Sequence, residues 1–269
     1  MDYHNNKMKI IGFIFSVLVS GLILNSFYTS VHAHNFYQNH DSFFFTLVKQ
    51  FEIEDTIASN NHDANKSNSF QHSENAASIL KRIMLFNNTM ASNANFVNTY
   101  KPIFDGLNIT TKALIAANLA DECLKEYGLA QGLNVTLATS LLNMTMNSGT
   151  GMKMGGNMTI PSGPTSQALN LSNKHSIGQA NFETSAMIAK SLKILFLKSL
   201  KNATLEKSIG LMQISVEMKT ESVKNLEQGI DSLTSAVNRK APLLEVFSIV
   251  HGQIHPNLFL AYDLKLKGE

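Results

Sequence analysis

Residues 209–237, IGLMQISVEMKTESVKNLEQGIDSLTSAV, carry the clearest structural signal in the chain. Apolar side chains recur there in steps of three and four, and the pattern passes over only Lys219. Such a seven-residue repeat is typical of a helix that packs lengthwise against other helices. The apolar positions are Ile209, Met212, Val216, Val223, Leu226, Ile230, Leu233 and Val237. The sequence therefore predicts an all-α fold, a helical bundle.

The region before this repeat predicts further helices. Two of them are defined by apolar faces, namely Phe44, Leu47, Val48, Phe51 and Ala58 after an N-cap at Asp41, and Phe70, Ala76, Leu80, Ile83 and Met84 after Asp63. Residues 93–104 show a weaker helical pattern that includes Pro102. Another helix is expected to start after Thr110 or Thr111, to stop at Gly128 and to place Cys123 in the core.

The remaining segments complete the bundle. A helix is expected from Phe182, with a solvated face formed by Lys190, Lys193, Lys198 and Lys201. Residues 243–250 predict a shorter helix, and Pro256 can start a last one. No segment shows the alternation of a β-strand.

The expected organisation is two helical halves joined by a loop. The N-terminal half spans residues 34–143 and the C-terminal half spans residues 181–269. Residues 144–180, which are rich in Met, Gly and Asn, are interpreted as the flexible connection. We expect the halves to pack as one bundle, and two independent domains are the alternative.

The first residues have the organisation of an export signal. Lys7 and Lys9 precede the apolar run IIGFIFSVLVSGLIL of residues 10–24. A charged start followed by a short apolar run is typical of a secretory signal. The sequence therefore predicts that the rest of the chain lies outside the cytoplasm, secreted or at the cell surface.

The fate of this signal has two interpretations. Val31 and Ala33 lie where small residues precede a cleavage site, which predicts a signal peptide of residues 1–33 and a mature chain that starts at His34. Alternatively, residues 8–27 have about the 20-residue length that a membrane-spanning helix needs and would remain as an anchor.

Composition excludes some functions. Removal of residues 1–33 takes away Lys7, Lys9 and Asp2, so the formal charge falls from +2 to +1. A nearly neutral chain without a basic run is a poor binder of nucleic acid, because neutralisation of phosphate dominates that affinity. Cys123 is the only cysteine, so the chain forms no internal disulfide. Stability must therefore come from packing.

Eight sequons of the form N-x-[ST] indicate a candidate glycoprotein. In an exported protein such asparagines can carry glycans on the surface. The alternative is chance, because Asn, Ser and Thr are abundant in this chain. The sequons are at Asn65, Asn87, Asn108, Asn134, Asn143, Asn157, Asn170 and Asn202.

The exported start is combined with the segments DSFFFTLVKQFEIE (41–54), HSENAASILKRI (72–83) and VNRKAPLLEVFSIVHGQIHPNLFLAYDL (237–264). In this combination the chain resembles a group of uncharacterised secreted proteins of ammonia-oxidising archaea. The resemblance covers most of the mature chain, and the stretch His-Pro-Asn-Leu (255–258) is its clearest signature. It implies an archaeal cell envelope, where N-glycosylation is common and copper enzymes are prominent, and it implies no particular activity or site.

The loop suggests one metal site. Thioethers are soft ligands that select Cu(I), and a polar, glycine-rich segment would let several of them converge on one ion. The alternative is a cap over the bundle, because Met fills irregular gaps in a core. The residues concerned are Met144, Met146, Met152, Met154 and Met158.

The histidines suggest two other metal sites. His251 and His255 have the spacing that brings two imidazoles together on a helix for zinc or copper. However, Gly252 and Pro256 argue against helical geometry there, which favours a hydrogen-bonded structural pair that caps the last helix. His34, as the mature N-terminus, offers an amino group and an imidazole for copper if His40 or His72 joins it, and the alternative is coincidence.

No catalytic motif is evident, because the chain shows no nucleophile with its base, no phosphate-binding glycine loop and no HExxH. The neighbouring carboxylates Glu52, Glu54 and Asp55 are expected to be solvated. We therefore expect a non-enzymatic, exported helical-bundle protein of the cell envelope with a binding or surface-organising role and a protein partner there. The alternative is a copper-handling protein that uses the Met-rich loop.

Overall fold

The computed structural model describes residues 36–60, 66–87, 96–134, 171–205 and 214–266. These ranges are helical and contain no strand, which confirms the all-α prediction. Their only extended pairing is a single antiparallel bridge between Phe36 and Leu266. Residues 33–269 form one compact unit. The predicted signal peptide and the five methionines of the loop lie outside the described residues.

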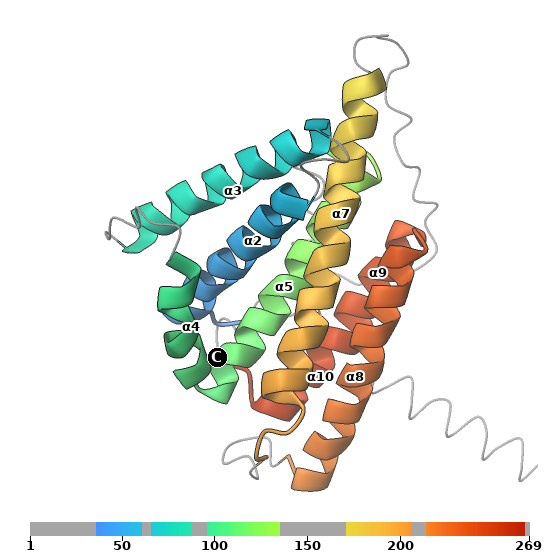
Figure 1. The fold of residues 1–269 in the computed structure, drawn as a ribbon. Coiled ribbons are helices and arrows are strands. Elements are labelled where there is room, and N and C mark those ends of the chain that lie inside the picture. The colour runs from blue at the N-terminus through green and yellow to red at the C-terminus, as the bar shows by residue number, and fades with distance from the viewer. Residues whose placement is uncertain (1–35, 61–65, 88–95, 135–170, 206–213, 267–269) are drawn as a thin grey trace, which may run out of the picture. The chain divides into compact units, whose positions relative to one another are not determined.

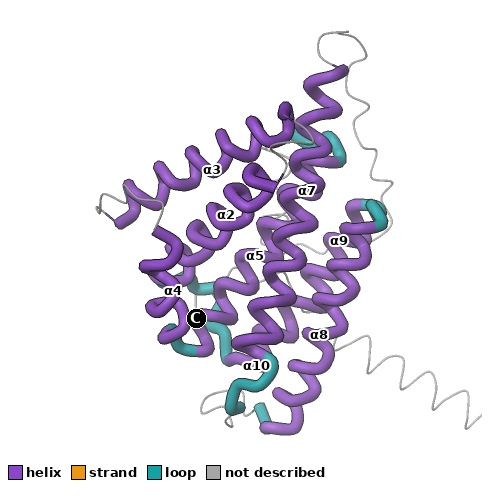
Figure 2. Tube along the Cα trace, viewed as in Figure 1, coloured by secondary structure: helices purple, strands orange, loops and turns teal. Residues whose placement is uncertain are grey.

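Helices from both predicted halves surround a central helix (Figure 1). Figure 2 shows that helices, with short connections, make up the described chain. In chain order the elements are α2 (His40–Asn60), α3 (Lys66–Asn87), α4 (Phe96–Gly106), α5 (Ile109–Ala130), α7 (Leu171–Leu195), η1 (Phe196–Leu200), α8 (Val216–Asn238), α9 (Leu243–Ile249), η2 (Val250–Ile254) and α10 (His255–Tyr262), where η marks a π-helical turn.

The central helix is α5, which packs against α2, α7 and α10. Its inward residues are small or aliphatic, and Ala113, Ala116 and Ala120 are completely buried, so neighbouring helices approach closely. Cys123 is also buried and donates its thiol hydrogen to the Ser185 carbonyl oxygen at 3.3 Å. Burial raises the pKa of this thiol to about 12. The structure thus confirms that Cys123 is a core residue.

Two predicted helix starts were wrong by a few residues. Asn39, not Asp41, caps α2, because its side-chain oxygen accepts a hydrogen bond from the Ser42 amide at 2.7 Å. Asn108, not Thr110 or Thr111, caps α5 in the same way. Asparagine is as good an N-cap as aspartate or threonine, so the sequence offered several competing caps.

The end of α5 was also predicted too early. Gly128 is helical and buried, and the helix continues to Ala130. Gly132 has φ +90 and supplies the left-handed turn after the helix. The later glycine is therefore the one whose conformation a side chain would strain.

The face of α3 differs from the predicted one. Ala76 and Ile83 are buried as expected, but Phe70 is 65% exposed and Met84 is also exposed. The inward face instead carries polar side chains, including Asn68 and His72. Hydrophobic spacing pointed to the wrong side of α3 because its buried surface is partly polar.

The seven-residue repeat is largely confirmed in α8. Its buried apolar positions are Val223, Leu226, Ile230, Leu233 and Val237, whereas Val216 is exposed and Ile209 and Met212 lie outside the described residues. The interrupting Lys219 is buried as well, at 2% exposure, and forms an ion pair with Asp263. The repeat is thus continuous in space, with an ion pair at one of its positions.

The predicted loop is shorter than residues 144–180. α7 begins at Leu171, so the last ten residues assigned to the loop are helical. The predicted solvated face lies at the surface, where Lys193 pairs with Asp231 and Lys201 with Glu227; its lysines are Lys190, Lys193, Lys198 and Lys201. None of the helices in the described ranges combines the length and low charge that a membrane crossing requires.

Candidate metal centre

A continuous helical run from Leu243 to Tyr262 carries both C-terminal histidines. The expectation that Gly252 and Pro256 would break the helix there was wrong, because His255 has helical dihedral angles, φ −58 and ψ −47. The run changes from α to π geometry over η2, and Pro256 is the second residue of α10, where its missing N–H is tolerated. Short π-helical turns inside α-helices are frequent at functional sites.

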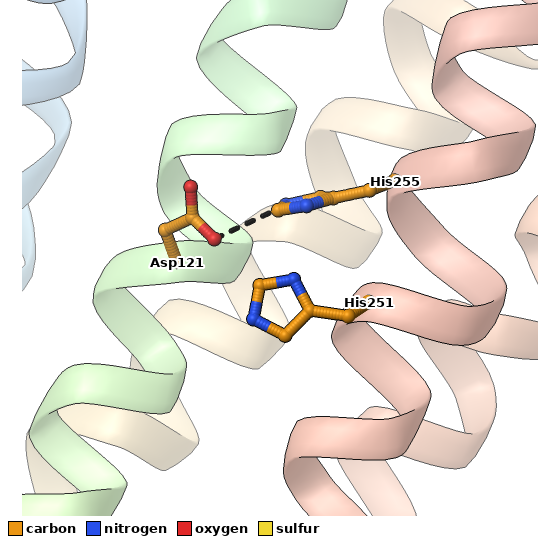
Figure 3. A group of neighbouring side chains, drawn as sticks. All are labelled: Asp121, His251 and His255. Carbon is orange, nitrogen blue, oxygen red and sulfur yellow. Dashed lines mark ion pairs between the residues drawn. The ribbon is translucent and has the colours of Figure 1, made fainter. Parts of the chain in front are cut away.

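The wider turn places two imidazoles on the face that looks toward α5. Figure 3 shows that both rings point at Asp121, which projects from α5. One nitrogen or oxygen atom from each of Asp121, His251 and His255 lies within 4.8 Å of the others. The His255 Nε2 atom lies 3.2 Å from Asp121 Oδ1, and the two imidazole rings meet edge to face with centroids 5.0 Å apart.

The two ring nitrogens of His251 have no hydrogen bond within the described part of the chain. The His255 ring instead pairs with Asp121, whose Oδ1 atom lies 3.2 Å from His255 Nε2, and the Ala117 backbone also favours its charged form. His251 is 7% and His255 1% exposed. The expected structural pair therefore fits His255, whereas His251 is buried without a partner in the described residues.

Such an arrangement is costly without a ligand. Buried polar groups in native proteins almost always have a partner, and burial of one without a hydrogen bond costs about 1–3 kcal/mol in mutational data. Here several converge from two helices on one point. A bound cation would satisfy them together.

The electrostatics of the group also suit a cation. Burial lowers the pKa of His251 to about 4, with a smaller contribution from the nearby His255, while Asp121 opposes the shift. Burial is also the largest single effect on His255 and lowers its pKa, but the charge and hydrogen bonding of Asp121 together with a hydrogen bond to the Ala117 backbone outweigh it, so the pKa of His255 is raised overall. At neutral pH His251 is therefore a neutral ligand with one ring-nitrogen lone pair to offer, beside a carboxylate.

Aromatic and aliphatic residues surround the site. The Phe36 ring packs edge-on against His255 at 5.5 Å, and the Phe247 ring lies 4.4 Å from the His251 ring. A Cβ at Gly229 of α8 would lie 3.1 Å from Gln253 Cβ, so this glycine lets η2 pack closely on α8. The two imidazoles are therefore largely shielded from water, which strengthens electrostatic interactions around them, while the Asp121 side chain is 33% exposed.

Two imidazoles and one carboxylate form a donor set for borderline divalent ions. Imidazole suits zinc, copper, iron and nickel, and a site with three protein ligands leaves a coordination position open. The orphaned buried nitrogens fit such an ion, so the residues present match the histidine-based site that the sequence suggested. The contribution of Asp121 was missed, because Asp121 and Glu122 adjoin each other in the sequence and nothing local shows that Asp121 turns toward the C-terminal histidines.

A second buried group, which we call the His72 cluster, consists of Glu54, His72 and Glu183. The His72 Nδ1 atom lies 2.6 Å from Glu54 Oε2, and Nε2 lies 3.2 Å from Glu183 Oε2. Thr184 donates a hydrogen bond to Glu54 Oε1 at 2.8 Å. The prediction that Glu54 is solvated was wrong, because the residue is only 4% exposed.

Of the other candidate ligands, those within the described residues, His40 and His72, are not part of the metal centre. Both ring nitrogens of His72 already contact carboxylates, so His72 is a poor second ligand for His34. His40 is exposed and lies beside Asp41. His34, Met144, Met146, Met152, Met154 and Met158 lie outside the described residues.

Among the sequons, Asn108, Asn134 and Asn202 are exposed, and Asn87 is the last residue of α3. The Asn108 side-chain oxygen caps α5 and leaves its amide nitrogen, the atom that carries a glycan, outside that hydrogen bond. The remaining sequons, Asn65, Asn143, Asn157 and Asn170, lie outside the described residues. No protein-family model, curated protein or solved structure matches the chain.

Proposed function

We propose that this protein is an extracytoplasmic helical-bundle protein that binds a divalent transition-metal ion through Asp121, His251 and His255. The observation that carries the proposal is the convergence of two buried imidazoles, one of which has no partner within the described residues, on a carboxylate from another helix. Export rests on the N-terminal signal in the sequence. The proposed role in the cell envelope is binding rather than catalysis, in line with the lack of a catalytic motif.

The chain's own residues determine how an ion would be held. Asp121 supplies negative charge from α5, and His251 and His255 supply neutral nitrogen donors once His255 has lost its proton. Because binding must displace that proton, the affinity is expected to fall in acid. The ion would join α5 to η2 and α10, so metal binding would also stabilise the fold.

Metal analysis tests the proposal. The mature chain, purified without chelator and loaded with Zn(II) or Cu(II), is expected to retain a single equivalent after desalting. His251→Ala and His255→Ala should each lose it, whereas His40→Ala should not, because His40 is an exposed histidine outside the group. Retention of the metal by a variant lacking both buried histidines would contradict the proposal.

The sequence offers a further ligand, His34, which lies outside the described residues. If the signal is cleaved after Ala33, the terminal amine and imidazole of His34 would both be available to a metal ion. Extension of the mature chain by one Gly before His34 should then weaken metal binding, and an unchanged affinity would remove His34 from the donor set.

The second candidate function is Cu(I) handling by the Met-rich loop. It is favoured by five methionines in a polar, glycine-rich segment, where core packing does not account for them. Cu(I) competition should distinguish it from the histidine site. Replacement of Met144, Met146, Met152, Met154 and Met158 by Leu should abolish Cu(I) binding and leave Zn(II) binding intact.

A further inference from the structure

A polar cavity of about 230 Å³ lies away from the metal centre, in contact with the His72 cluster. It is lined by residues of α2, α3, α5 and α7. Ligand cavities for drug-sized molecules usually hold about 300–1,000 Å³, so this one suits a smaller molecule.

On the α2 side of the cavity, the carboxylate of Glu54 is held in a fixed position by hydrogen bonds. Both carboxylate oxygens of Glu54 are held, one by Thr184 and the other by His72 and by the Asn75 amide at 3.3 Å. Burial lowers the pKa of His72, but hydrogen bonds and charge attraction from Glu54 and Glu183 outweigh it, so the pKa is raised overall. The Glu54 carboxylate is therefore paired and immobile. It forms part of the cavity wall, and its hydrogen bonds are satisfied without a ligand.

The α5 side has more negative than positive charge. Lys125 forms an ion pair with Glu122 and lies 3.5 Å from Glu126, so one ammonium group serves two carboxylates. Burial raises the pKa of Glu126 to about 7, Lys125 opposes the shift, and Glu122 and Glu54 add to it. The Glu126 carboxylate thus lacks a full countercharge, and a cation beside it would supply one.

The α3 side presents the opposite charge. Arg82 lines the cavity, is exposed, and has no hydrogen-bond or ion-pair partner within the described ranges. A guanidinium group matches a carboxylate through two parallel hydrogen bonds. A ligand with only an amine would be repelled by the positive charge of Arg82, and a ligand with only a carboxylate would be repelled by the negative charge of Glu126.

We infer that the cavity binds a small zwitterion of the amino-acid class, with its ammonium group beside Glu126 and its carboxylate on Arg82. The inference rests on the placement of these two charges on two different helices that line one small polar cavity. It is independent of the metal centre, because no residue of the cavity belongs to the Asp121, His251 and His255 group.

Calorimetric titration of the full mature chain tests the inference. The common L-amino acids are titrated one by one, with propylamine and propionate as the two half-ligands. At least one amino acid should bind about tenfold or more tightly than either half-ligand, and its N-acetyl derivative should lose that affinity. The inference is overturned if no amino acid binds or if a half-ligand binds equally well.

Variants locate the binding. Arg82→Gln and Glu126→Gln should each raise the dissociation constant about tenfold or more, since hydrogen bonds to charged groups contribute about 1.5–3 kcal/mol. Lys81→Gln and Glu221→Gln are matched controls, because both residues are exposed and lie outside the cavity. Unchanged binding in Arg82→Gln overturns the inference, and this exposed position keeps the test decisive even if the buried Glu126→Gln variant unfolds.

Discussion

The His72 cluster and the metal centre use the same kinds of side chain and differ in how these are satisfied. In the His72 cluster each ring nitrogen meets a carboxylate, and Thr184 and Asn75 hold the remaining sites of Glu54. In the metal centre His255 pairs with Asp121, but neither ring nitrogen of His251 has a hydrogen bond within the described residues. The first group is complete without a ligand, whereas the second has the donors that a ligand needs. Burial of histidine is therefore not by itself the sign of a site.

The largest expected difference between the groups is in stability. His72→Ala should lower the free energy of unfolding by about 3–5 kcal/mol, because it leaves the buried Glu54 carboxylate without its charged partner. Urea denaturation at pH 6 measures this change. A loss below about 1 kcal/mol would show that the cluster is not an integral part of the core.

Metal binding should stabilise the protein only through the metal centre and not through the His72 cluster. At a free Zn(II) concentration of about 100 times the dissociation constant, the parent protein should gain about 2.7 kcal/mol. His255→Ala should gain nothing, and His72→Gln should gain as much as the parent if it remains folded. An equal gain in His255→Ala would place the bound metal elsewhere.

His72 and His251 should respond to pH with opposite signs. The raised pKa of His72 gives stability that is fully present below about 6.5 and is lost as pH rises through its folded-state pKa. His251, with its pKa lowered to about 4, stays neutral in the folded protein, so it reduces stability as pH falls from about 6.5 toward 4. Free energies of unfolding of the metal-free variants should be measured on both sides of about pH 6.5. His72→Gln and His251→Leu should each lose one of these two dependences of stability on pH. Slopes that persist in both variants would contradict these assignments.

Glu126 should give a smaller effect. Its raised pKa means that ionisation opposes folding as pH rises from about 4.5 to about 7. Glu126→Gln should remove this cost of ionisation and stabilise the protein at pH 8 by up to about 3 kcal/mol. The gain should be smaller if Lys125 moves with the carboxylate and neutralises it. A loss of stability at pH 8 would show that the ion pair with Lys125 outweighs desolvation.

The smallest effect is expected from His251→Leu without metal. Because the ring nitrogens of His251 make no hydrogen bond, replacement by an apolar side chain of similar size should leave stability at pH 7 unchanged or raise it by about 1 kcal/mol. The contrast with His72→Ala is the sharpest single test of the comparison. Similar large losses at both positions would show that the two histidines are equally integrated.

Some elements of the fold were predictable because their signal is local. The buried positions of α8 and the core position of Cys123 follow from apolar spacing alone, and both are confirmed. The start of α7 and the inward face of α3 were not predictable in this way. The first ten residues of α7 are polar, and the inward face of α3 carries Asn68 and His72, whose burial depends on partners far away in the chain.

The sequence by itself determined that the chain is all-α and that His251 and His255 are spaced as potential ligands, since both properties depend on periodicity within a few residues. Only the tertiary structure decided that the helix continues through Pro256, that Asp121 lies opposite the two imidazoles, and that His72 is already paired. The reason is physical: whether a buried nitrogen is satisfied depends on groups from other helices, more than 100 residues away in the chain for Glu183 and His72. Local spacing does not contain that information, and packing does.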